Sequence, residues 1–91
     1  MKVTMRDLKS LYYIRHKLRT EDVAADERDR LSKKAERLEG YIDSIDDPMV
    51  RDMFVYRFVR GFTWVKTAHK IGGGNTADGV RMTVKRYLEK Q

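Results

Sequence analysis

The sequence predicts an all-α fold, in which an N-terminal helical hairpin (residues 1–45) precedes a three-helix unit of helix-turn-helix type (residues 46–91). Apolar residues recur at helical spacing along most of the 91 residues, the alternation typical of strands is hard to find, and there is one proline. With 41% hydrophobic and 37% charged residues, the chain has enough apolar side chains for one modest core. That composition also argues against a disordered chain.

The first helix is expected from about Thr4 to Arg19, with Thr4 as its N-cap and Asp7 three residues later. Its apolar residues at helical spacing define the face that we expect to be buried. This face comprises Leu8, Leu11, Tyr12 and Leu18, with Ile14 at its border.

The second helix is expected from about Asp26 to Ser44, and its apolar residues follow a 4-3-4-3 spacing. These positions are Leu31, Ala35, Leu38, Ile42 and Ile45. The seam covers only two heptads, which favours packing on the first helix as a hairpin. The alternative is a homodimer formed through Leu31, Leu38 and Ile42.

Three further helices follow, each with a recognisable start. Asp47 caps a helix whose first residue is Pro48 and which ends at Gly61, a residue free to adopt a left-handed conformation. Thr63 begins a short helix that ends near Ile71, and the last helix starts at Asn75 or Thr76 and runs to about Lys90. The predicted buried face of the last helix comprises Val80, Val84, Tyr87 and Leu88, and Phe54, Phe58, Phe62 and Trp64 are expected in the core.

The positive charge is concentrated at the C-terminal end. The net charge is +6, and from Arg57 onward the chain has eight basic and two acidic residues, so these residues carry all of it. A basic segment of this kind favours a polyanionic partner such as nucleic acid. A solvated surface that serves only solubility is the alternative interpretation.

The stretch from Ile45 to Leu88 resembles the C-terminal DNA-binding region of bacterial sigma factors. It is most similar to the small sigma-region-four-like regulators of phages and prophages. About half of the chain is covered, and the turn is lengthened by Gly72-Gly73-Gly74 relative to the family. The matching residues are Tyr56 to Gly61, Thr63-Trp64, Ala68, Ile71-Gly72, Gly74 to Arg81 and Tyr87-Leu88.

The resemblance implies a double-stranded DNA-binding transcriptional regulator whose recognition helix, about residues 76–90, lies in the major groove. A stand-alone sigma factor needs a further domain, so we do not expect these 91 residues to act as one. The residues expected to contact bases are Thr76, Asp78, Arg81, Met82 and Lys85. Those expected to contact phosphates are Arg60, Thr63, Lys66, Lys70, Asn75 and Arg86.

Several of these residues also have a structural interpretation. Thr63, Asn75 and Thr76 fit helix caps, and the basic residues of the last helix fit a solvated face. Arg57 either holds a phosphate or pairs with Asp47 or Asp52.

Other classes of function are disfavoured by what the sequence contains. There are no cysteines, and His16 and His69 lack a ligand pattern, so we expect no metal and no cofactor. The triple glycine lacks the Lys-Ser/Thr ending of a P-loop, and a chain of this length builds a catalytic cleft with difficulty, so we expect no enzyme. No membrane span or signal peptide is recognised, which predicts a cytoplasmic protein.

Two alternative functions stay open from the sequence. One is a small terminase-type subunit that recognises DNA for packaging, since such subunits also use a helix-turn-helix. The other is a protein-interaction module that contacts RNA polymerase or another acidic protein surface.

Overall fold

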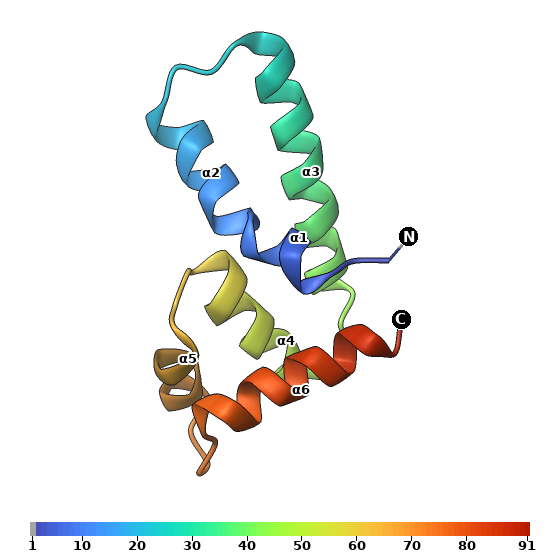
Figure 1. Ribbon diagram of the computed structural model, residues 1–91, viewed down its shortest axis with the longest axis vertical. Coiled ribbons are helices and arrows are strands. Elements are labelled where there is room, and N and C mark those ends of the chain that lie inside the picture. Colours follow the sequence, from blue (N-terminus) through green and yellow to red (C-terminus); the bar gives the residue numbers. More distant parts are fainter. Residues whose placement is uncertain (1) are drawn as a thin grey trace.

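The computed structural model describes residues 2–91, and every regular element within that range is helical, as the sequence predicts. Figure 1 shows the helices α2 and α3 side by side as a projecting hairpin, with the remaining helices packed below it. The elements are α1 (Met5–Lys9), α2 (Leu11–Thr20), α3 (Ala25–Asp43), α4 (Pro48–Phe54), the π-helical turn η1 (Val55–Val59), α5 (Trp64–Ile71) and α6 (Ala77–Glu89).

The prediction of a single helix from Thr4 to Arg19 is wrong in one respect. The helix is interrupted at Ser10, which separates α1 from α2. The predicted cap is present: Thr4 Oγ1 accepts a hydrogen bond from the Asp7 amide, and the Asp7 carboxylate accepts one from the Thr4 amide. The Ser10 hydroxyl then donates to the Asp7 carbonyl at 2.6 Å, a local bond that competes with the helical ladder.

This interruption changes which side chains of the N-terminal segment are buried. Leu8 and Leu11 are buried as predicted, and Ile14, expected at the border, is also buried. Tyr12 was expected on the buried face, and its side chain is instead 45% exposed. The break at Ser10 rotates α2 relative to α1, so one continuous helical wheel does not describe both.

The hairpin of α2 and α3 forms at nearly the predicted residues. Ala35, Leu38, Ile42 and Ile45 are buried and Leu31 is half-buried, and Arg15 of α2 pairs with Glu39 of α3 across the hairpin (Nε to Oε2, 3.0 Å). The seam is therefore occupied by packing within the chain. Leu38 and Ile42 are fully buried in this seam, and the homodimer through Leu31, Leu38 and Ile42 stays a prediction.

The helix that begins at Pro48 changes its geometry before it ends. Asp47 Oδ1 accepts hydrogen bonds from the Met49 and Val50 amides, which confirms the predicted cap. After Phe54 the backbone widens into η1, which closes with an i to i+5 bond from the Arg60 amide to the Val55 carbonyl at 2.9 Å. No pattern in the sequence predicts this π-helical turn.

Gly61 ends this helix in the left-handed conformation that the sequence predicts, with φ of 74°. Its missing side chain has a second consequence, because a Cβ atom placed there would lie 2.8 Å from the Tyr12 ring. Gly61 thus allows α2 to rest directly on the loop after η1.

The last two helices begin and end close to their predicted limits. Thr63 and Thr76 are the N-caps of α5 and α6, and Gly72, Gly73 and Gly74 in the connecting turn all have positive φ. On α6 the buried side chains are Val80, Val84 and Leu88, and α5 and α4 both pack against this helix.

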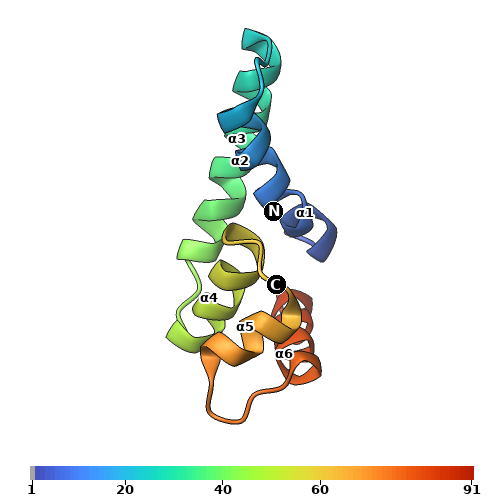
Figure 2. The same ribbon diagram turned by 90° about the vertical axis from the view of Figure 1, so that its left-hand side faces the viewer.

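One hydrophobic core joins the two halves of the chain. The buried residues Leu8 and Leu38 belong to the same cluster as Phe54, Phe58 and Val84. The termini are also tied together, since the Val3 amide donates to Gln91 Oε1 at 2.8 Å and Gln91 Nε2 donates to the Val3 carbonyl. Figures 1 and 2 show α1 between the hairpin and α6, so the predicted division at residue 45 separates helices that share a core.

Substitution of Gly61 by Ala is expected to lower the free energy of unfolding by more than about 1 kcal/mol, because it adds a Cβ at positive φ against Tyr12. The matched control is Gly40→Ala, within α3, where a Cβ meets no atom within 4 Å and φ is not positive. That control is expected to gain about 0.5–1 kcal/mol. Urea denaturation of both variants tests this, and an unchanged Gly61→Ala protein contradicts the described contact.

The Tyr41 hydroxyl is buried without a hydrogen-bond partner, and burial raises its pKa above the ordinary value of 10.0. The stability that the neutral phenol provides is therefore complete below pH 10.0 and is lost as the pH rises through the raised pKa. We expect Tyr41→Phe to be at least as stable as the unmodified protein at pH 7 and less sensitive to alkali. Denaturation curves between pH 7 and about pH 11 measure both effects; a clear loss of stability at pH 7 contradicts an unpartnered hydroxyl.

Candidate nucleic-acid interface

The outward side of α6 carries most of the residues predicted to contact bases. Thr76, Asp78, Arg81 and Lys85 are exposed, and Met82 is half-buried. Arg81 and Lys85 are separated by one helical turn and project from neighbouring positions on one side of α6. Val80, Val84 and Leu88 form the buried stripe of α6, and Arg81 and Lys85 lie beside this stripe, exposed at the edge of the helix that borders α1.

Glu89 follows Lys85 by four residues and lines a hollow with it, and the second acidic group beside this row is Asp78. Its carboxylate Oδ1 lies 3.9 Å from Arg81 Nη2, and its side chain is 91% exposed. A surface ion pair at that distance contributes little stability, so the Arg81 guanidinium exchanges partners at small cost.

The predicted polar contacts at the helix starts are used as caps. Thr76 Oγ1 accepts from the Gly79 amide at 3.0 Å, and Thr63 Oγ1 accepts from the Lys66 amide at 3.1 Å. Asn75 Nδ2 donates to the Gly72 carbonyl at 2.6 Å and closes the glycine turn. The interpretation as helix caps is therefore confirmed for Thr63 and Thr76, whereas Asn75 stabilises the turn and caps no helix. Contacts of these three residues to DNA stay a prediction.

Arg60 and Lys66, both predicted to bind phosphates, lie over the ring of Phe62, which precedes α5 in the sequence. The Phe62 and Tyr56 rings stack with centroids 5.7 Å apart. Lys66 Nζ lies 4.2 Å and Arg60 Cζ 5.5 Å from the centroid of Phe62. Phe62, expected in the core, is thus half-buried and carries two exposed cations on its ring.

The other predicted phosphate contacts are distributed along the same helices. Lys70 is exposed and follows Lys66 by four residues, so it extends that basic side of α5. Arg86 is also exposed, but it follows Arg81 by five residues and projects from a different side of α6. The structure therefore brings Arg60, Lys66 and Lys70 together and separates Arg86 from Arg81.

Arg57 lies beneath this surface and pairs with neither of the two carboxylates considered from the sequence. Its Nη1 donates to the Phe62 carbonyl at 2.8 Å, and its Cζ lies 4.7 Å from the centroid of Trp64. Trp64 in turn contacts the buried Phe58 edge-on, with centroids 6.0 Å apart. Within residues 2–91 the Arg57 guanidinium has no carboxylate partner, and its Nε is buried without a hydrogen bond.

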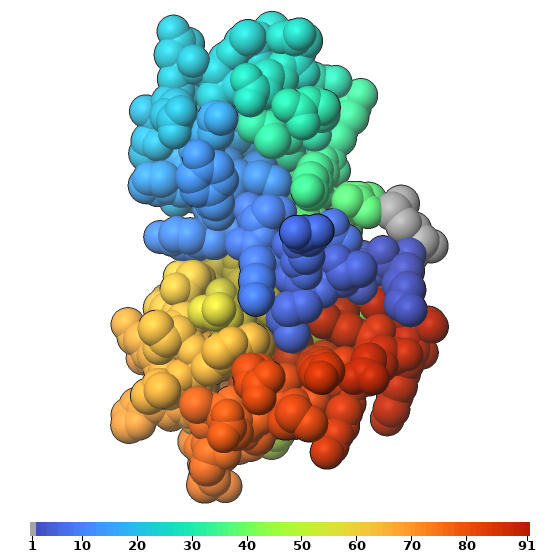
Figure 3. Space-filling model, viewed as in Figure 1, coloured from blue at the N-terminus to red at the C-terminus, as the bar shows by residue number. Residues whose placement is uncertain are grey.

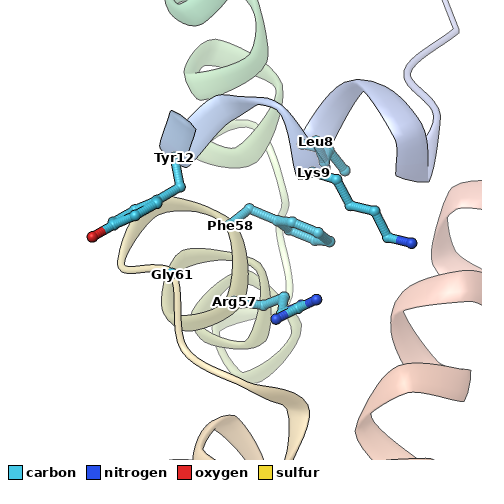
Figure 4. A pocket seen from close by; sticks show the side chains of 6 residues that line it. All are labelled: Leu8, Lys9, Tyr12, Arg57, Phe58 and Gly61. Carbon is cyan, nitrogen blue, oxygen red and sulfur yellow. The ribbon is translucent and has the colours of Figure 1, made fainter. Parts of the chain in front are cut away.

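Two hollows meet at Lys9, a residue that the sequence analysis did not select. One, of about 260 Å³, lies between α1, α5 and α6. The other, of about 280 Å³, lies between α1, α2 and η1 and is shown in Figure 4. The first is lined by Met5, Lys9, Trp64, Arg81 and Lys85, and the second by Leu8, Lys9, Tyr12, Arg57, Phe58 and Gly61.

No acidic residue lines either hollow, and together the two linings contain four basic residues. Lys9 is not predicted from the sequence, because the whole N-terminal segment is expected to form part of the hairpin. The one local feature that could have indicated a separate α1 is Ser10. This serine is the C-cap of α1, and its hydroxyl donates to the Asp7 carbonyl.

Within the part of the chain that the structure describes, no group of three or more His, Asp or Glu side chains is arranged to hold a metal ion. Across residues 2–91 no helix has both the length and the apolar character needed to cross a membrane. Neither a family model, nor a curated protein, nor a solved structure matches this chain. A functional interpretation therefore depends on the geometry and charge of the described residues.

Removal of the Thr76 hydroxyl is expected to destabilise the protein, because it leaves the Gly79 amide without its cap at the start of α6. Thr76→Ala should cost about 0.5–2 kcal/mol, whereas Thr76→Ser keeps the acceptor and should cost much less. Chemical denaturation of the pair measures the difference. Equal stability of the two variants would show that this hydrogen bond does not hold α6.

Proposed function

We propose that this protein is a double-stranded DNA-binding transcriptional regulator, in which α5, the glycine turn and α6 act as a helix-turn-helix. The observation that carries the proposal is the exposed row of Arg81 and Lys85 on α6, beside the stripe of Val80, Val84 and Leu88 that anchors this helix in the core. The resemblance of residues 45–88 to sigma-region-four-like regulators of phages supports the same assignment.

In this proposal α6 enters the major groove. Its 13 residues give a rod of about 20 Å, and the groove is about 12 Å wide, which admits one helix. Arg81 is the first candidate for base recognition because its guanidinium donates two parallel hydrogen bonds to guanine. Lys85, Asp78, Met82 and Thr76 complete the set of proposed base contacts.

Phosphate contacts are proposed for the cations on and before α5. Arg60 and Lys66 are already held close to one another by the Phe62 ring, so less conformational freedom is lost when they bind a phosphate. Lys70 extends this row along α5, and Thr63 and Asn75 lie at the helix starts. Such contacts set the register of the protein on the duplex without reading its sequence.

Binding to a random-sequence DNA duplex across a salt series tests the proposal directly. We expect the logarithm of the affinity to fall linearly with the logarithm of the salt concentration, with a slope that counts the neutralised phosphates at about 0.9 for each contact. No binding at low salt contradicts the proposal and shifts attention to contacts with a protein partner such as polymerase. Formation of rings on DNA would instead favour a packaging subunit.

Loss of the proposed base contacts should weaken binding to a selected DNA site. We expect Arg81→Ala and Lys85→Ala each to cost about 1–3 kcal/mol of binding free energy and to reduce discrimination between sites. Lys33→Ala is the charge-matched control: Lys33 lies on α3, is 73% exposed and pairs with Asp29. Fluorescence anisotropy gives the three affinities. The assignment of α6 as the recognition helix is contradicted if both Arg81→Ala and Lys85→Ala bind DNA as tightly as the Lys33→Ala control.

A further inference from the structure

We propose that α1 belongs to the DNA interface, and that Lys9 and Arg57 bind one backbone phosphate in the hollow between α1 and η1. This inference rests on the proposed function. It extends the interface beyond the three C-terminal helices, because Lys9 precedes the hairpin in the sequence and is brought to this surface only by the fold.

The position of Lys9 is fixed by the burial of its neighbour. Leu8 is fully buried in the common core, and Val3 is bonded to Gln91 after the end of α6. α1 is therefore fixed on both sides. Before it, Val3 is hydrogen-bonded to Gln91, and at its C-terminal end Leu8 and Leu11 are packed in the core. Figure 3 shows the surface of α1 lying directly against that of α6.

The hollow between α1 and η1 has the character of an anion site. Lys9 and Arg57 both line it: the Lys9 side chain runs past the Phe58 ring with its ammonium end toward α6, and the Arg57 guanidinium lies beneath the same ring (Figure 4). Leu8, Tyr12 and Phe58 provide apolar walls, which strengthen the attraction between an anion and the two cations. No carboxylate lines the hollow to compete for them.

The state of Arg57 favours an occupant with negative charge. A guanidinium placed partly out of water is costly unless an opposite charge or enough hydrogen bonds compensate it. Here one hydrogen bond to the Phe62 carbonyl and the Trp64 ring are its partners among the described residues, and Nε is buried without an acceptor. A phosphate oxygen supplies the missing charge and hydrogen-bond acceptors.

The neighbouring hollow connects this site with α6. Lys9 lines both hollows, and Arg81 and Lys85 line the second one. A DNA backbone that passes over α1 is thus adjacent to the helix proposed to lie in the groove. Duplex DNA explains both hollows with one ligand, whereas a free phosphate would account for only one.

The test compares salt series for Lys9→Gln and for Lys9→Arg on the same duplex. Lys9→Gln should reduce the slope by about 0.9 and weaken binding by about eightfold at 0.1 M salt, which is the loss of one phosphate contact. Lys9→Arg keeps the charge and should behave like the unmodified protein. The control Lys33→Gln, on α3, should leave the slope unchanged.

The effect should be the same for selected and random DNA, because a phosphate contact carries no sequence information. The double variant Lys9→Gln/Arg57→Gln should lose less affinity than the sum of the single variants, because both side chains bind one phosphate. Circular dichroism tests whether the Arg57→Gln protein folds. If that protein is unfolded, the salt series of Lys9→Gln by itself tests the inference.

Three results overturn the inference, and they are distinguishable. If the unmodified protein does not bind DNA, the proposed function fails as well. If it binds DNA and Arg81→Ala weakens binding while Lys9→Gln leaves the slope unchanged, only the role of α1 fails. If inorganic phosphate binds in a Lys9-dependent manner while the DNA slope is independent of Lys9, the site serves a free anion and not DNA.

Discussion

The burial of α1 and α2 in the core of the C-terminal helices is the constraint on which the rest of the structure depends. Leu8 and Leu11 are fully buried in the cluster that contains Phe58 and Val84. Truncation of a buried leucine in such a cluster costs about 2–5 kcal/mol, a large part of the stability of a domain of this size. The same packing sets the distance from α1 to α6 and so decides which cations share a surface.

The charge on that surface is arranged by aromatic side chains more than by ion pairs. Phe62 holds Arg60 and Lys66, and Trp64 holds Arg57. Among residues 2–91, the ion pairs lie mainly in the hairpin, where Arg15 pairs with Glu39 and Lys33 with Asp29. Cations that rest on rings keep their charge uncompensated, which suits binding to a polyanion.

Local signals in the sequence predicted the helix starts well. Thr4, Asp47, Thr63 and Thr76 all cap the helices expected of them, since capping depends on a few neighbouring residues. Gly61 has the predicted positive φ for the same reason. The buried face of α6 also follows directly from its apolar spacing.

Other features depend on contacts between distant residues, and the sequence did not reveal them. The break at Ser10 turned Tyr12 outward, because one hydroxyl bond interrupts a pattern that looks continuous. The π-helical turn after Phe54 has no sequence signature that we recognise. The position of Lys9 beside Arg57 follows only from the fold, since these residues are 48 positions apart.

Chemical-shift mapping by NMR during titration with duplex DNA tests the central claim most directly. The account predicts that amides of α6 around Arg81 and Lys85 shift together with those at Lys9, Arg57 and the start of α5. Amides at the tip of the α2–α3 hairpin should not shift and serve as an internal reference. Shifts concentrated in the hairpin, or their absence from α6, would contradict the proposed DNA interface.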